Sequence, residues 1–382
     1  MTSRFYFTTI LSIAFLSFFS KELSISHERK PVSDTARTIE NSKIQVALLL
    51  DVSNSMDGLI SQAKDQLWNM VKVIGKIRCN EARPQIEIAL YEYGRSSNDA
   101  KVGYVKQITA FTNDLDKLFY SLYSLTTQGG EEYCGHVINS SLEELVWDTS
   151  ATGYRAIFIS GNESFLQGDI SYTEACKKAK SKGIVINTIY CGRREKGVEE
   201  NWNLGAECGN GNFTNIDQDA TPISFPTPYD TMLIVWYEKL KHTSIPYGSM
   251  PVYDTVPTYD TKQIDKVIGW VVVKADTHLY SQSSWELTDA FEMDSSIIDD
   301  LDMKTLPDSL ENKTRKELKV IVSDNLVERK RIRSEIKKMD AQRDQYIAKE
   351  KDKLTGELPK TLLTEIEKII REQIRRFNMK IE

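Results

Sequence analysis

The spacing of apolar and polar residues in the first half of the chain predicts strands and helices in alternation. Residues Lys43–Asp51 (KIQVALLLD) form a nearly unbroken apolar run. Such a run is typical of a parallel strand whose two faces are both covered by helices, so we expect it at the centre of a sheet. An amphipathic helix is expected at 56–76, because its apolar residues recur with the period of one helix face.

The same alternation continues as far as about residue 216. Further strands are predicted at 85–93, 105–111, 154–160, 184–190 and 212–216, and helices at 114–122, 135–147, 172–181 and 199–206. The pattern QIEIALYEY at 85–93 indicates a half-exposed strand, with 105–111 as its antiparallel partner. Strands that alternate with helices pair mostly in parallel, through right-handed crossovers. The sequence therefore predicts an α/β domain over 43–220 with a doubly wound, mostly parallel sheet.

The second half of the chain is predicted to be mainly helical. We expect a proline-containing linker at 221–228, a helix at 229–240 and an irregular stretch at 245–258. Residues 261–275 fit a helix capped by Asp260 or, through their valines, a strand, and we favour the helix. The segment 221–305 is therefore expected to be a mixed extension of helices and loops.

A long charged helix is predicted at 310–354. Its inward positions recur at alternating steps of four and three residues, the spacing of a coiled-coil seam, although three of the nine positions are polar. Gly356 and Pro359 interrupt the pattern, and a similar spacing resumes at 362–377. We expect 306–382 to form an antiparallel helical hairpin or a coiled-coil arm through which the chain can self-associate. The alternative is an arm that only packs on the domain.

The N-terminus has the order of a secretory signal. Residues 5–19 carry no charge, lie between Arg4 and Lys21, and are fewer than the roughly 20 apolar residues of a membrane-spanning helix. We expect a signal peptide at 1–26 and a polar linker at 27–42. The protein is then secreted or periplasmic, and it meets the membrane only if the signal stays uncleaved as an anchor.

Charge is unevenly distributed along the chain. The formal net charge is −6, to which 308–382 contributes +5 and the remainder −11. Basic residues of this tail alternate with acidic ones at helical spacing, as they do on a solvated helix face. The pattern argues against a nucleic-acid-binding stripe, so we expect no nucleic acid among the partners.

Candidate chemistry follows the first strand directly. Asp51, Ser53 and Ser55 alternate along an extended turn, so their side chains can point together into the crevice where open α/β sheets bind ligands. One carboxylate and two hydroxyls are hard oxygen donors, which suit Mg²⁺, Mn²⁺ or Ca²⁺ rather than zinc. The alternative is that these side chains only cap the following helix.

These three residues resemble the Asp-x-Ser-x-Ser motif of von Willebrand factor type A (VWA) domains. A closer similarity is to a group of exported bacterial VWA-domain proteins of unassigned role, through ALYEYG (89–94), GGEEYCG (129–135), IFISGNESF (157–165) and INTIYCG (186–192). The likeness continues weakly into SSWELTDA (283–290) and the charged helices. It implies a Rossmann-like VWA fold with a C-terminal α-helical extension.

The resemblance also implies a metal-ion-dependent adhesion site, from which this chain departs in two loops. The second loop offers Thr127 ahead of its glycines, but has Glu131 where the family usually has a Thr. The third loop has Gly161 where the family has an Asp, followed by Asn162 and Glu163. The expected metal ligands are therefore Asp51, Ser53, Ser55, Thr127 and an inward-turned Glu131, with Asn162 and Glu163 on a partner-binding rim.

Five cysteines are an odd number, so at least one is unpaired within the chain. None has the close pairing of a zinc site. Cys134 and Cys191 each lie just after elements that end at the rim, so a disulfide between the second loop and the strand at 184–190 is a hypothesis. The alternative is that the cysteines are buried free thiols.

Three functions fit these residues. The first is binding or adhesion to a protein partner, whose carboxylate completes the coordination of a bound cation. The second is a metal-free envelope scaffold that binds through its helical arm. The third, a metal-assisted hydrolase, is disfavoured because the four histidines show no ligand pairing and common nucleophile and phosphate-loop motifs are missing. We therefore expect a binding protein rather than an enzyme.

Overall fold

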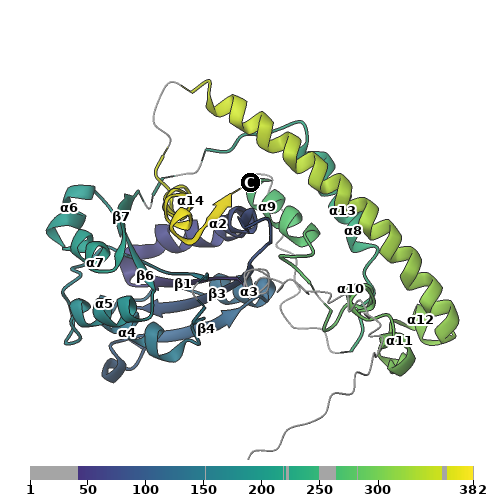
Figure 1. The fold of residues 1–382 in the computed structure, drawn as a ribbon, viewed down its shortest axis with the longest axis horizontal. Helices are drawn as coiled ribbons and strands as arrows, with labels where there is room; N and C mark the ends of the chain where they lie inside the picture. Colours follow the sequence, from purple (N-terminus) through teal and green to yellow (C-terminus); the bar gives the residue numbers. More distant parts are fainter. Residues whose placement is uncertain are drawn as a thin grey trace, which may run out of the picture.

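A central six-stranded sheet organises the first part of the chain. The computed structural model describes residues 42–150, 152–217, 219–220, 223–248, 264–281, 283–354 and 359–381. The sheet has the strand order β4-β3-β1-β5-β6-β7 (Figure 1). Its strands are β1 (Lys43–Asp51), β3 (Gln85–Tyr93), β4 (Lys106–Thr112), β5 (Tyr154–Gly161), β6 (Val185–Cys191) and β7 (Asn210–Ile216). Neighbouring strands are parallel except for β3 with β4, so the predicted doubly wound, mostly parallel sheet is confirmed.

Strand β1 lies in the middle of the sheet and is buried on both faces. It pairs with β3 on one side and β5 on the other. Leu48 and Leu50 belong to the hydrophobic core on one face, whereas Ala47 and Leu49 belong to the core on the other. The strand is therefore apolar because both of its faces are buried, as the sequence predicted.

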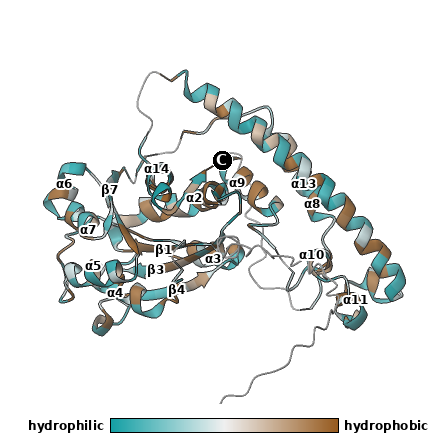
Figure 2. Ribbon diagram, in the orientation of Figure 1, coloured by the Kyte–Doolittle hydropathy of each residue, from teal (hydrophilic) through white to brown (hydrophobic). Residues whose placement is uncertain are grey.

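Two layers of helices provide these cores. One face is covered by α2 (Asp57–Gly75), α3 (Leu115–Tyr123) and α14 (Leu362–Gln373), and the other by α4 (Cys134–Glu144), α5 (Tyr172–Ser181), α6 (Arg194–Glu199) and α7 (Trp202–Cys208). Figure 2 shows hydrophobic residues along the strands between these layers. Helix α6 follows the carboxyl end of β6, so the carboxyl edge of the sheet is the edge near α6 and α7.

Three local predictions need correction. Strand β3 is buried over its second half rather than half exposed, because Ile88 and Leu90 join one core while Ala89 and Tyr91 join the other. The helix predicted at 199–206 is α7, which starts later, at Trp202; α6 is a separate helix before it, and Asn201, whose φ is +68°, lies between them. The long helix starts at Arg315 rather than near residue 310, because Thr314 and Glu317 form a capping box.

The predicted helical hairpin at the C-terminus is wrong. Helix α14 does not turn back along α13 (Arg315–Lys351); it packs on α2 and β7 as part of the layer that covers the sheet. Its Gln373 accepts a hydrogen bond from the Tyr154 hydroxyl at 2.8 Å and donates to Asn187 Oδ1 at 2.6 Å. The apolar spacing at 362–377 therefore reflects burial against a sheet, for which an amphipathic helix is equally suited. After α14, β8 (Met379–Ile381) pairs with β2 (Ile77–Cys79) in a two-stranded sheet.

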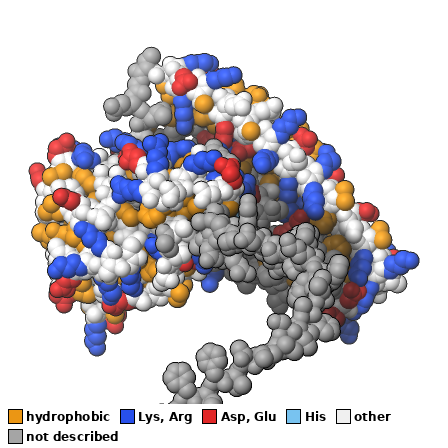
Figure 3. Space-filling view, viewed as in Figure 1, with side chains coloured by type: hydrophobic (Ala, Val, Ile, Leu, Met, Phe, Trp, Pro, Cys, Tyr) orange, Lys and Arg blue, Asp and Glu red, His pale blue; other side chains and the backbone are white. Residues whose placement is uncertain are grey.

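Helix α13 is the long element that covers the other helices of the second half. It lies along α8 (Asp230–Lys241), α9 (Ile264–Ala275) and α10 (Leu287–Met293), near the short helices α11 (Ile297–Asp300) and α12 (Asp308–Glu311). The helix predicted at 261–275 is confirmed from residue 264 onward as α9, whereas its first residues and the capping role of Asp260 lie outside the described residues. Basic and acidic side chains are mixed along the outer surface of α13 (Figure 3).

The predicted seam of α13 is its buried face, but it faces these helices and not a hairpin partner. Its two arginines are buried and paired with carboxylates. Arg329 lies 2.6 Å from Glu286 and 2.5 Å from Asp289, and Arg343 lies 2.8 Å from Asp230. The polar seam positions therefore hold α13 to α10 and α8 through buried ion pairs. Removing one partner of such a pair strongly lowers the stability of the fold.

No helix within the described residues is long and apolar enough to cross a membrane. The signal peptide expected at 1–26 lies outside the described residues, as does the linker at 27–42 apart from Ser42. Both remain predictions from the sequence.

Replacing Arg329 by Met should destabilise the protein strongly, because Glu286 then stays fully buried without its cation and Asp289 loses one of its two arginines. We expect a loss of about 3–5 kcal/mol in the free energy of unfolding, measured by urea denaturation with tryptophan fluorescence. Arg331→Met on the same helix is the control, because its pair with Glu328 is exposed, and it should have a far smaller effect. Equal effects of the two substitutions would contradict the assignment.

Candidate metal site at the carboxyl edge of the sheet

The carboxyl end of β1 places Asp51 at the bottom of the candidate site. Its side chain is fully buried, and its Oδ1 accepts a hydrogen bond from the backbone amide of Ser53 at 2.7 Å. The chain then enters a short 3-10 helix, η1 (Asn54–Met56), which leads into α2. This compact turn brings the hydroxyls of Ser53 and Ser55 within 3.4 Å of each other. The three motif residues are therefore brought together as the sequence indicated.

Asp51 is a buried carboxyl group with only half of its hydrogen bonding satisfied. Its Oδ2 is buried and has no hydrogen-bond partner among the described residues. Burial raises the pKa of Asp51 from 3.8 to about 7, although hydrogen bonds from Ser53 oppose the rise and the nearby Glu163 adds to it. A proton or a cation is thus needed to neutralise this group near neutral pH.

The third loop contributes Asn162 to the same place. Asn162 Nδ2 donates to the Ser55 hydroxyl at 3.0 Å, and Ser55 lies exposed at the surface above the buried Asp51. Glu163, the next residue, is exposed and its backbone carbonyl accepts a hydrogen bond from Trp202 Nε1 at 2.7 Å. The expected rim residues Asn162 and Glu163 therefore lie beside the motif, held by α7.

The second loop supplies a carboxylate, but not the one expected. Glu131 is exposed, whereas the neighbouring Glu132 is buried and its pKa is raised to about 7 by burial and by the nearby charges of Asp51 and Glu163. The inward-turned residue of this loop is thus Glu132, and the prediction of Glu131 is wrong. Thr127 also differs from the expectation, because its hydroxyl donates to Asp57 at the start of α2.

A glycine permits Asp51 and Glu132 to approach each other. A Cβ atom on Gly94, whose φ is +82°, would lie 2.9 Å from Asp51 Oδ1 and 3.0 Å from Glu132 Cγ. Any side chain there would push the two carboxyl groups apart. In the sequence, the phrase GGEEY offers two adjacent glutamates, and only the backbone direction of the loop decides which one turns inward.

At Gly161, where VWA domains have an Asp, other groups fill the space. A Cβ atom on Gly161 would lie 2.5 Å from the Tyr93 hydroxyl and 3.1 Å from Asp51 Oδ2. The Tyr93 hydroxyl donates to the Ser160 carbonyl at 3.0 Å, and burial raises the pKa of Tyr93 well above its ordinary value. Tyr93 is therefore neutral and packs beside Asp51. The sequence did not indicate a role for Tyr93.

Backbone hydrogen bonds fix the second loop against the first. The amide of Gln128 donates to the Val52 carbonyl at 2.8 Å, and the amide of Gly129 donates to Asn54 Oδ1 at 2.8 Å. Ser96, after β3, donates from its amide to the Gly129 carbonyl at 2.8 Å. The loops around Asp51 thus form one connected surface, which we call the rim site: Asp51, Ser53, Ser55, Glu132 and Asn162.

The disulfide hypothesised between Cys134 and Cys191 is wrong. All five cysteines are free thiols, and these two are buried. Cys134 Sγ lies 4.0 Å from the Tyr93 hydroxyl, and burial raises the pKa values of both thiols strongly. They fill space below Asp51 as small apolar residues, which is the alternative that the sequence left open.

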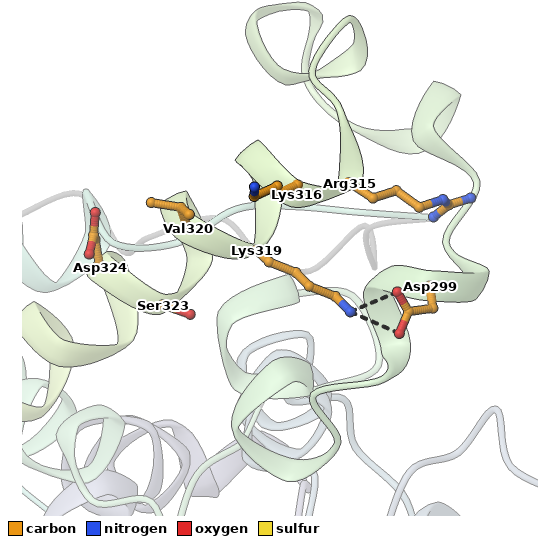
Figure 4. Close-up of a pocket in the computed structure, with 7 residues that line it drawn as sticks. All are labelled: Asp299, Arg315, Lys316, Lys319, Val320, Ser323 and Asp324. Carbon is orange, nitrogen blue, oxygen red and sulfur yellow. Dashed lines mark hydrogen bonds and ion pairs between the residues drawn. The ribbon is translucent and has the colours of Figure 1, made fainter.

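A second depression, of about 600 Å³, lies where α11 meets the start of α13 (Figure 4). Two of its basic residues already have partners in the protein. Arg315 donates to the carbonyls of Ile298 and Leu301, and Lys319 lies 2.7 Å from Asp299. These contacts hold α11 to α13, so the depression is a weaker candidate for a ligand site than the rim.

The residues of the rim site fit a hard cation that is bound by oxygen atoms, few of which carry a negative charge. Within the described residues, no cluster of three or more His, Cys, Asp or Glu side chains forms a ready metal cage. The rim instead offers the unpartnered Oδ2 of Asp51, the hydroxyls of Ser53 and Ser55 and the nearby Glu132. Oxygen donors of this kind suit Mg²⁺, Mn²⁺ or Ca²⁺.

Comparisons with known proteins give similar folds at low identity. No family model and no curated protein sequence matches the chain. Among solved structures, the hypothetical protein BatB from Bacteroides thetaiotaomicron is 18% identical, with 46% of this chain and 90% of that chain covered and a TM-score of 0.34. A VWA protein from Catenulispora acidiphila is 10% identical (46% and 39% covered, TM-score 0.34). Mussel byssus proximal thread matrix protein 1, with a zinc-occupied metal-ion-dependent adhesion site, is 12% identical (46% and 42% covered, TM-score 0.34). VWA domains are thus among the structures that the chain is similar to, as the motifs predicted.

In chelator, the stability of the protein should fall as the pH rises from about 4 to about 7. Folded Asp51 holds its proton up to a pKa of about 7, whereas the unfolded group releases it near 3.8, so the folded state binds more protons in this interval. The difference of about 3 pH units corresponds to roughly 4 kcal/mol above pH 7. Asp51→Asn should remove the part of this loss that Asp51 contributes, leaving the part from Glu132, whose pKa is also raised to about 7, and should be the more stable protein at pH 8, as measured by urea denaturation at several pH values.

Glu131→Gln, in the exposed neighbour of Glu132, is the matched control and should keep the wild-type pH profile. If wild type and Asp51→Asn lose stability equally with rising pH, the buried charge is not at Asp51.

Proposed function

We propose that this chain is an exported VWA-domain protein that binds a protein partner through a divalent cation held at the rim site. The observation that carries the proposal is the buried Oδ2 of Asp51, which has no hydrogen-bond partner among the residues that the structure describes. A buried charge is retained only when a counter-charge offsets its lost hydration. A cation bound here supplies that counter-charge above about pH 7, where the proton is lost.

Asp51, Ser53 and Ser55 would hold this cation, and Glu132 lies close enough to bind it or to share its charge. Ser55 is exposed, whereas Asp51 is buried, so a cation between them is accessible from one side only. Because the two hydroxyls are neutral, the bound cation keeps a net positive charge. The open side is therefore suited to a carboxylate of a partner protein.

Oxygen-only ligands favour Mg²⁺, Mn²⁺ or Ca²⁺ for this chain. The mussel thread protein holds zinc in its adhesion-site motif, so zinc belongs among the ions to be tested. The sequence of residues 1–26 supports export, which would place the rim site in the periplasm or outside the cell, where such ions are plentiful.

A role in binding is favoured over catalysis. Hydrolysis would require a general base beside a bound water, and the buried Glu132, whose pKa is about 7, is the nearest such group. Yet Glu132 lies against Asp51 below the surface and the surrounding groups are hydroxyls and an amide. The alternative of a metal-free scaffold that binds through α13 predicts stability that is independent of divalent ions.

Divalent cations should raise the melting temperature of the wild-type protein at pH 7.5, because a ligand that binds only the folded state stabilises it. At a cation concentration 100-fold above Kd the gain is about 2.7 kcal/mol. Asp51→Ala and Ser53→Ala should abolish or weaken this gain, whereas Ser181→Ala, in the exposed last turn of α5, should retain it. A melting temperature unchanged by Mg²⁺, Mn²⁺, Ca²⁺ and Zn²⁺ would refute the cation site.

Glu132→Gln should weaken cation binding about 10-fold or more, because it removes the negative charge next to Asp51. Glu131→Gln is the control and should bind as wild type does. Isothermal titration with each cation measures both. Equal losses from the two variants would mean that Glu131 and Glu132 act only through the overall charge of the rim.

A further inference from the structure

One pair of thiols, Cys176 and Cys208, lies on neighbouring helices on one face of the sheet. Cys176 is on α5 and Cys208 is the last residue of α7, and these helices pack together on the same face of the sheet. Cys176 Sγ contacts the carbonyl of Gly205, one turn before Cys208, at 3.8 Å. Burial and the neighbouring Cys208 thiol raise the pKa of Cys176 above its ordinary value. The side chains are therefore already adjacent, as a disulfide requires.

Access to solvent separates this pair from the other cysteines. Cys79, Cys134 and Cys191 are buried, whereas Cys208 is partly exposed beside the buried Cys176. An oxidant in solution can react with Cys208, and Cys176 can then displace the oxidant from Cys208. A buried thiol cannot take part in the first of these reactions.

We propose that Cys176 and Cys208 form a disulfide when the protein meets a small-molecule disulfide such as oxidised glutathione. The thiolate of Cys208 attacks one sulfur of the oxidant, forms a mixed disulfide and releases one thiol. Cys176 then gives up its proton, attacks Cys208 Sγ and releases the second thiol. Two protein thiols are oxidised and one disulfide is reduced to two thiols, so the electrons and protons balance.

The bond would join the two helices that flank the third rim loop. This loop, 162–171, starts at Asn162 and leads into α5, and α7 holds its first part through Trp202. Trp202 donates to the Glu163 carbonyl, and its ring lies 5.1 Å from that of Phe165. A bond between α5 and α7 therefore restrains the elements that position Asn162 and Glu163. The disulfide forms whether or not the rim binds a cation, so it does not rest on the proposed function.

The test is oxidation of the purified full-length protein with oxidised glutathione, followed by alkylation of free thiols and non-reducing peptide mapping. We expect a single linkage, between the peptides that contain Cys176 and Cys208, and a rise in melting temperature of about 5 °C that reductant reverses. Cys208→Ser, at the partly exposed position, should abolish both effects, and Cys79→Ser should leave both intact.

Three outcomes would overturn the proposal: no linked peptide after oxidation, a linkage between other cysteines, or a Cys208 bridge between two chains. Because Cys176 is buried and its replacement can weaken folding, the Cys208→Ser variant carries the test. In reductant, the melting temperature of this variant should match that of the wild type within about 2 °C. A larger difference would mean that the rise in melting temperature on oxidation cannot be attributed to the disulfide.

Discussion

The rim of this molecule is organised around one buried carboxylate that the protein satisfies only in part. Asp51 accepts the Ser53 amide at Oδ1, its Oδ2 has no hydrogen-bond partner within the described part of the chain, and Glu132 and Glu163 add negative charge nearby. A structural carboxylate would normally be surrounded by donors. Here the closest groups are hydroxyls, which serve equally as donors to the carboxylate and as ligands to a cation. The arrangement is stable with a proton or a cation present and costly without either.

Much of the fold could be predicted from local pattern, because burial on two sides leaves a clear mark in sequence. The apolar run of β1 and the period of α2 indicated a doubly wound sheet, and Asp51, Ser53 and Ser55 were placed at its carboxyl edge by spacing alone. The position of α14 could not be predicted in this way. Its apolar stripe suits a hairpin partner and a sheet equally, and the contacts of Gln373 with Tyr154 and Asn187, which decide the matter, join residues far apart in the chain.

The site was predicted less well than the fold because its loops depend on backbone direction. Glu131 and Glu132 are chemically equivalent, and the sequence offers no reason to prefer the second. Tyr93 was overlooked because it belongs to a strand pattern, yet its hydroxyl and Asp51 Oδ2 both lie where a side chain on Gly161 would need space. Once Tyr93 fills that place, a glycine is required, and the family's third-loop Asp cannot be restored without displacing the ring.

The amino and carboxyl edges of the sheet make different contacts. At the amino edge, the chain just before β3 meets the segment after α9, where Arg83 pairs with Asp276 and His278 contacts the Pro84 carbonyl. Helix α13 is tied to the sheet layer through α2, by ion pairs of Lys72 with Asp340 and of Lys76 with Asp344. None of these contacts involves a residue of the rim site. The helical half can thus brace the sheet from one side while the loops at the opposite edge vary in sequence, because a parallel sheet leaves its carboxyl edge free for ligand binding.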